Sequence, residues 1–88
     1  MDDILINSYP SIDMHGYDRD SARVTTQDFV TWNVALGNET VVIIHGIGQG
    51  IVRKAVHEEL KHNRNVLKYW VDVFNPGVTV VKIKISLE

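Results

Sequence analysis

The sequence predicts an α/β fold, a two-layer sandwich in which the elements follow the order β-α-β-α-β-β and the strands form a mixed four-stranded sheet. Three observations predict it. Two segments of helical periodicity alternate with segments rich in β-branched residues, and 88 residues is the size of one small domain. The composition, 44% hydrophobic and 23% charged, is that of an ordinary globular domain. These 88 residues are therefore expected to form one domain rather than two.

The chain is expected to begin with an extension, residues 1–10, followed by one domain, residues 11–88. Apolar and polar residues alternate over residues 11–14, which is typical of a short, half-buried strand. This strand is expected to end near His15.

A helix is predicted from Arg19 to Leu36. Gly16 supplies a turn before it and Asp18 an N-cap, and Gly37 is a plausible C-cap. Apolar residues recur at spacings of three, four or seven and so share one helical face. They are Ala22, Phe29, Trp32 and Leu36.

The segment 40–44 consists of β-branched residues throughout and predicts a central strand that is buried on both faces. After a turn over residues 45–50, a second helix is predicted over residues 51–62. Its expected buried residues are Val52, Ala55, Val56 and Leu60.

Two further strands are predicted over residues 66–74 and 78–87. They are joined at residues 75–77, where Pro76 and Gly77 suit a type II turn that needs a positive φ at the glycine. One face of the last strand is expected to be apolar and the other to carry lysines. The apolar face consists of Val81, Ile83, Ile85 and Leu87, and the lysines are Lys82 and Lys84.

The composition excludes several classes of function. The chain has no cysteine, which rules out disulfides, thiolate zinc sites and a cysteine nucleophile and fits a reducing cytoplasm. The longest stretch without a charged residue, residues 40–52, is shorter than the roughly 20 residues of a membrane span. The two acidic residues after Met1 do not resemble a secretory signal.

Charge is distributed unevenly along the chain. Residues 1–44 contain two basic and seven acidic residues, whereas residues 45–88 contain seven basic and four acidic ones. The net charge of -2 argues against a strongly basic nucleic-acid binder. The basic second half nevertheless permits a basic face, although scattered surface charges are an equally good explanation.

His15 and His45 are expected at one edge of the sheet. Each follows one of the first two strands, and a helical connection makes those strands parallel, so their carboxyl ends lie together. Ligands of parallel α/β sheets usually bind at this edge.

The strongest local signal is the run His-Gly-Ile-Gly-Gln-Gly at residues 45–50, directly before a helix. Its alternate glycines, Gly46, Gly48 and Gly50, allow close approach of the backbone, and a helix start suits a phosphate. The spacing is neither a Walker A loop nor a dinucleotide fingerprint, and a plain tight turn is the alternative. Arg53 falls in the first helical turns and could point its guanidinium at an anion, or it could be a surface arginine.

Several other residues that suggest metal binding or base stacking are expected to be solvated or to take part in packing. His57 and His62 are five residues apart, which does not fit the four-residue spacing of a metalloprotease helix, and both are expected to be solvated. Trp32, Tyr69 and Trp70 are interpreted as core or edge packing rather than as platforms for bases.

Three motifs in order resemble the Smr domain, the small MutS-related domain. They are Ile12-Asp13-Met14-His15-Gly16, the glycine run with Val52-Arg53, and Gly77-Val78-Thr79-Val80-Val81. The resemblance covers residues 11 to 85. It implies a fold similar to the C-terminal domain of bacterial translation initiation factor three, and nicking or cleavage of DNA or RNA.

The resemblance also implies the site residues. Asp13 and His15 match the family's Leu-Asp-x-His motif, and His45, Gly46 and Gly48 match its His/Thr-Gly-x-Gly motif. Arg53 matches the arginine of a Leu-Arg pair. This chain departs from the family in having Ile47 where a lysine is common and in keeping only Gly77 of the usual paired glycines.

The chemistry of these residues agrees with the resemblance. Backbone N–H groups of residues 46–50 would bind phosphate, Arg53 would stabilise developing charge, and His15 would act as general base or acid. Asp13 could orient His15 or hold a divalent ion, and the pair could also be a hydrogen-bonded strand end. His45 is a second proton carrier or the start of the turn. The sequence requires no cofactor, with Mg²⁺ or Mn²⁺ left open.

DNA or RNA is the expected partner, with no membrane and no specific protein partner indicated. A non-catalytic module that binds nucleic acid or the ribosome is the main alternative to a nuclease. A regulatory domain that contacts protein is a third possibility.

Overall fold

The computed structural model describes residues 8–85, which form six elements in the predicted order β-α-β-α-β-β. They are β1 (Ser11–Asp13), α2 (Arg19–Leu36), β2 (Thr40–Ile44), α3 (Ile51–His62), β3 (Val66–Val71) and β4 (Val78–Ile83). The bounds of both helices and of β2 agree with those predicted.

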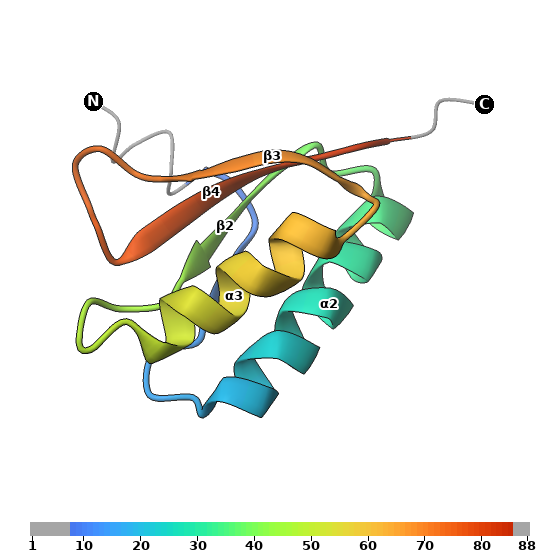
Figure 1. Ribbon diagram of the computed structural model, residues 1–88. Helices are drawn as coiled ribbons and strands as arrows, with labels where there is room; N and C mark the ends of the chain where they lie inside the picture. Colours follow the sequence, from blue (N-terminus) through green and yellow to red (C-terminus); the bar gives the residue numbers. More distant parts are fainter. Residues whose placement is uncertain (1–7, 86–88) are drawn as a thin grey trace.

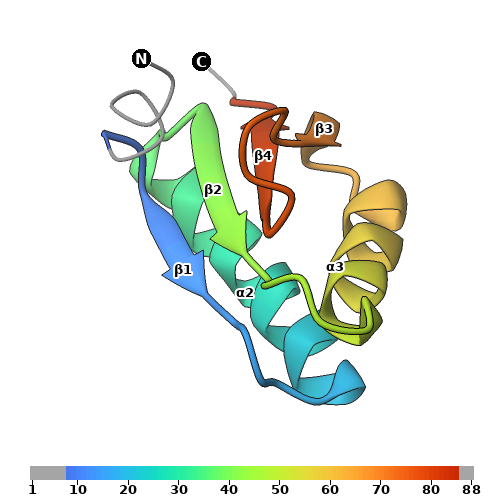
Figure 2. The same ribbon diagram turned by 90° about the vertical axis from the view of Figure 1, so that its left-hand side faces the viewer.

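The four strands form one mixed sheet in the order β1-β2-β4-β3. β1 pairs with β2 in parallel, and β4 is antiparallel to both of its neighbours. Both helices lie on the same face of this sheet (Figures 1 and 2). The predicted two-layer sandwich is therefore confirmed, with β2 and β4 as its central, buried strands.

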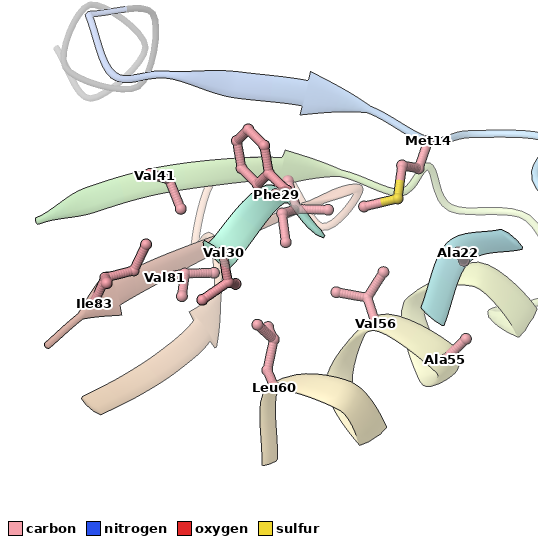
Figure 3. Close-up of a cluster of buried hydrophobic side chains, with 11 residues drawn as sticks. Met14, Ala22, Phe29, Val30, Val41, Ala55, Val56, Leu60, Val81 and Ile83 are labelled. Carbon is pink, nitrogen blue, oxygen red and sulfur yellow. The ribbon is translucent and has the colours of Figure 1, made fainter. Parts of the chain in front are cut away.

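The core fills the space between the helices and the sheet (Figure 3). Side chains from both helices meet alternate residues of β2 and β4 there, since alternate residues of a strand point to the same face. Leu60 is 1% exposed, and burial of such a side chain stabilises the fold by about 1.5–3 kcal/mol. The buried cluster consists of Met14, Ala22, Phe29, Val30, Val41, Ile43, Ala55, Val56, Leu60, Val81 and Ile83.

The ends of α2 follow the predicted capping. The Asp18 carboxylate accepts a hydrogen bond from the Ser21 N–H at 2.7 Å, and Gly37 takes the left-handed conformation, with φ of 76°. Such capping satisfies backbone groups that the helix leaves unpaired at its ends. No helix within residues 8–85 has the length and apolar character needed to cross a bilayer.

The buried face of α2 differs from the predicted one. Trp32 and Leu36 are 63% and 73% exposed, so their predicted place on the buried face is wrong. The polar side chains of Thr26 and Asn33 are buried instead, because each donates a hydrogen bond to a carbonyl oxygen one turn earlier in the helix. A polar group that is hydrogen-bonded can be buried at low cost.

The connection between β3 and β4 also differs from the prediction. β3 ends at Val71 because the Asp72 carboxylate accepts hydrogen bonds from the N–H groups of Phe74 and Asn75, which turns the chain. Gly77 does not have a positive φ, so the predicted type II turn is wrong. β4 ends at Ile83, and Leu87 lies outside the described residues.

Candidate functional site

The ends of β1 and β2 lie together at one edge of the sheet, as predicted for adjacent parallel strands. The N–H of Met14 donates to the carbonyl oxygen of Ile44 at 2.7 Å. Residues 46–50, hereafter the glycine loop, follow β2 and His45. A Cβ atom added to Gly46 would lie 3.1 Å from the Cβ atom of His15, so His15 lies against this loop.

Asp13 and His15 form a hydrogen-bonded pair. Asp13 Oδ1 accepts from the His15 N–H at 3.0 Å and lies 2.8 Å from His15 Nδ1. The backbone N–H of His15 is the main cause that lowers the pKa of Asp13, so the carboxyl is ionised at neutral pH. An ionised carboxylate only accepts hydrogen bonds, which assigns the proton of the neutral ring to Nδ1.

This arrangement leaves His15 Nε2 as an unprotonated nitrogen on an exposed ring. The side chains of His15 and Asp13 are 74% and 53% exposed. Nε2 makes no hydrogen bond within residues 8–85. A neutral imidazole whose second nitrogen is held by a carboxylate has the geometry of a general base.

The glycine loop depends on its glycines. Gly46, Gly48 and Gly50 have φ values of 80°, 34° and 84°, a region in which other residues are strained. Gly50 is the N-cap of α3 and provides no side chain to pair with the first N–H groups of the helix. The loop thus ends at a helix start that has partial positive charge.

Not all of the loop can bind a phosphate through its backbone. The N–H of Gly46 donates to the carbonyl oxygen of Gly77 at 3.0 Å, so the prediction that it binds phosphate directly does not fit this structure. The N–H groups from Ile47 to Gly50 donate no hydrogen bond within the described part of the chain. These groups, together with the first N–H groups of α3, are available to an anion.

Arg53 lies over the end of the loop. Its Nη2 atom is 3.3 Å from the position of a Cβ atom added to Gly50. The guanidinium therefore folds back from α3 toward the loop, where a bidentate cation can meet an anion held by the backbone.

Gly77 supports the loop from the other side. Its carbonyl oxygen accepts from the N–H groups of His45 and Gly46, at 2.9 and 3.0 Å. A Cβ atom on Gly77 would lie 3.3 Å from the Cα and carbonyl carbon atoms of Gly46. Glycine is needed here for close approach of two backbones rather than for its φ, which explains why the predicted turn type was wrong.

His45 lies beneath the loop and is 3% exposed. Its Nδ1 is 2.9 Å from the carbonyl oxygen of Gly46, which can only accept, so Nδ1 donates. Its Nε2 is 2.8 Å from Thr79 Oγ1 and, in the neutral ring, accepts the hydroxyl proton. Both ring nitrogens are therefore used within the fold, and neither is free for a substrate.

His57 continues this chain of hydrogen bonds. Its Nε2 lies 2.7 Å from Thr79 Oγ1, and because the hydroxyl proton points to His45, Nε2 of His57 is the donor. The ring is half-buried between His45 and Tyr69, with centroid distances of 5.9 and 5.1 Å. The prediction that His57 is solvated is wrong, because the inner face of α3 meets Thr79 of β4.

The sequence matches the Smr domain family over residues 12–84. The chain belongs to this family. Solved structures similar to it include two Smr proteins. The Smr domain of Thermus thermophilus MutS2 has a TM-score of 0.81 and 27% identity over 85% of this chain and 98% of its own. YdaL, a stand-alone small MutS-related protein from Escherichia coli, has a TM-score of 0.80 and 25% identity over 86% of this chain and 67% of its own.

Several relatives bear the name Endonuclease MutS2. The protein from Clostridium acetobutylicum is 36% identical over 77 residues, and that from Symbiobacterium thermophilum is 38% identical over 78 residues. These matches cover 84% and 85% of this chain but 10% of each relative. The chain therefore corresponds to a small part of those proteins.

The fold brings together most of the predicted site residues of this Smr domain. Asp13, His15, the glycine loop and Arg53 meet at one sheet edge, whereas His45 lies underneath. Thr79 and His57 were not predicted as part of the site. Thr79 lies within the third family motif, but only its place opposite His45 in the fold indicates a role.

Among residues 8–85 no group of three or more His, Cys, Asp or Glu side chains could hold a metal ion. Asp13 is the acidic residue nearest to His15 at the site. A divalent ion there would take most of its ligands from water or from a bound phosphate, as Mg²⁺ commonly does.

The stability of this Smr domain is expected to fall as the pH drops below about 6.5. Burial is the main cause that lowers the pKa of His45 and of His57 from 6.5, and the positive charge of Arg53 lowers both further. The unfolded chain therefore takes up protons that the folded domain does not. The free energy of unfolding falls by at most about 1.4 kcal/mol per pH unit for each ring. The fall ends once the pH is below the folded-state pKa values of both His45 and His57.

Urea unfolding between pH 7.5 and 5 tests this expectation, since protonation of carboxylates contributes little in that range. The variant His57→Gln should show a shallower decline because it lacks one of the two rings. A free energy of unfolding that stays constant over this range would contradict the assignment of two neutral, buried imidazoles.

Proposed function

We propose that this Smr domain binds nucleic acid through phosphate groups and weakly cleaves phosphodiester bonds, as a nicking endonuclease or an endoribonuclease. One observation carries the proposal. The Asp13–His15 pair, with Nε2 exposed, lies against a glycine loop that has free N–H groups and a guanidinium above it. A base, an anion cradle and a cation are the parts that phosphodiester hydrolysis needs.

Each group has a distinct role in the proposed reaction. N–H groups of residues 47–50 hold a non-bridging oxygen of the phosphate, and Arg53 stabilises the charge that develops on it. His15 Nε2 takes a proton from the attacking hydroxyl or water as its oxygen bonds to phosphorus, and Asp13 stabilises the imidazolium that forms. The P–O bond to the leaving oxygen breaks, and that oxygen takes up a proton from water. His45 acts as a positioning residue that holds the loop from below.

The second candidate is a module that binds nucleic acid or the ribosome without cleavage. The exposed side chain of Ile47 favours it, because an apolar residue occupies the loop at a position where related loops commonly carry a lysine. Loss of that cation weakens phosphate binding.

Incubation of the purified domain with labelled DNA and RNA, with EDTA, Mg²⁺ or Mn²⁺, separates the two candidates. We expect slow cleavage of at least one substrate. Cleavage that persists in EDTA would mean that Asp13 acts by orienting His15 rather than by holding a metal ion. Binding without any cleavage under all conditions would support the non-catalytic module, and neither binding nor cleavage would contradict both candidates.

The variant Ile47→Lys is expected to bind nucleic acid more tightly. One added phosphate contact steepens the dependence of log affinity on log salt concentration by about 0.9 on duplex DNA. Fluorescence anisotropy at several salt concentrations measures this slope. Val24→Lys, which adds the same charge on the exposed side of α2, is the control and should leave the slope unchanged. Equal slopes for Ile47→Lys and wild type would mean that the loop does not face the phosphates.

A further inference from the structure

A groove begins at the end of the glycine loop and runs along α3 toward the edge strand β3. We call it the α3 groove. It is continuous with the proposed phosphate site, because Gly50 and Arg53 border both. Beyond Gly50, the residues that line it include Arg53, Lys54, His57, Glu58, Lys61 and Tyr69.

The basic residues of the groove follow the helical repeat. Arg53, His57 and Lys61 are spaced four residues apart, so they lie along one side of α3 over about 12 Å. Lys54 adds a third positive charge to those of Arg53 and Lys61. The single acidic residue, Glu58, lies 3.9 Å from Arg19 of α2, which offsets its charge. The groove is therefore positively charged along its length.

Two rings form the inner wall of the groove. His57 and Tyr69 are both half-buried and contact each other edge to face, with centroids 5.1 Å apart. The hydrogen bond to Thr79 holds the His57 ring in its place in this wall.

We propose that the α3 groove holds the nucleic-acid strand next to the phosphate bound by the glycine loop, with Lys61 contacting a second phosphate. This proposal rests on the proposed function and adds the path of the strand. The 12 Å between the first and last of these helix positions corresponds to about three to four nucleotides of a B-form strand. The two contacts are thus far enough apart to fix the direction in which the strand crosses the loop.

Another basic surface lies on the sheet face away from the helices, where Lys68, Lys82 and Lys84 border a pocket, and two of these lysines already have partners. Lys68 Nζ lies 5.7 Å from the centroid of the Trp70 ring, and Lys82 Nζ donates to Thr40 Oγ1 at 2.7 Å. Tyr69 faces α3, so its neighbour Lys68 points to the opposite side of the sheet. These observations favour the α3 groove over that face.

The test compares Lys61→Gln with Lys68→Gln, which make the same change of charge on opposite faces. The affinity for a labelled single-stranded oligonucleotide of twelve nucleotides is measured by anisotropy at several salt concentrations. We expect Lys61→Gln to reduce the salt slope by about 0.7 and the affinity by about three- to five-fold near 0.1 M salt. Lys68→Gln should match the wild type. Amide NMR spectra verify that both variants are folded.

The other outcomes overturn the proposal in distinguishable ways. If the wild type binds and Lys61→Gln binds equally well, the groove is not used, although the proposed function stands. If Lys68→Gln alone loses affinity, the strand lies on the opposite face. Equal losses in both variants indicate a response to net charge only. If the wild type binds no oligonucleotide, the proposed function fails and the groove proposal fails with it.

Discussion

Replacing His15 with alanine is expected to lower the rate of phosphodiester cleavage by about 10²- to 10⁴-fold, the usual contribution of a positioned general acid or base. His15 is the exposed imidazole at the loop, and its Nε2 is free because Asp13 holds Nδ1. Substrate affinity should change far less, since the loop N–H groups and Arg53 remain. Single-turnover cleavage of the better substrate and an anisotropy titration measure the two effects.

His62→Ala is the matched control, because His62 is an exposed histidine at the far end of α3. It should cleave at the wild-type rate. Asp13→Asn should lower the rate by less than His15→Ala and should alter the pH profile, because the charge that stabilises the imidazolium is lost. Normal cleavage by folded His15→Ala would refute the catalytic role of His15.

Replacing Thr79 with valine is expected to reduce the free energy of unfolding by about 2–4 kcal/mol. Valine has nearly the same shape as threonine but lacks the hydroxyl that joins the two histidines. Nε2 of His45 and the N–H of His57 then lose their partner, and each unpaired buried group costs about 1–3 kcal/mol. His57 is half-buried, so water can satisfy part of its loss.

The same variant should also disturb the glycine loop, because His45 holds the carbonyl oxygen of Gly46. We expect amide NMR shifts over residues 45–50 and weaker binding of phosphate. Thr31→Val is the control, since Thr31 is an exposed threonine of α2 and should change stability by no more than about 0.5 kcal/mol. A similarly small effect of Thr79→Val in urea unfolding would contradict a structural role for the histidine chain.

Much of the fold could be predicted because its signals are local. Asp18 and Gly37 act at the two ends of α2 through their own side chain and φ, and neither depends on a distant partner. The burial of Thr26 and Asn33 could not be predicted in the same way. Hydrophobicity favours Trp32 and Leu36 on the buried face, but the position of α2 against the sheet and α3 decides which side of the helix is covered.

The candidate site likewise has one part that could be predicted from local sequence and another part that could not. The Asp13–His15 pair, two residues apart, and the glycine loop before α3 could be predicted from the sequence alone. Their place at one sheet edge was also predicted, since two parallel strands joined through a helix end at the same edge. Three features depend on how distant segments pack in the fold: His45 lies beneath the loop, Gly77 supports it, and His57 joins the site.

The physical reason is that these partners are distant in the chain. Thr79 is 34 residues from His45 and 22 from His57, and a hydrogen bond at such a separation leaves no periodicity in the sequence. A histidine after a strand can be an exposed base or a buried link, as His15 and His45 respectively are. Which of the two it becomes depends on whether another element, here β4, covers its ring and provides partners for both nitrogens.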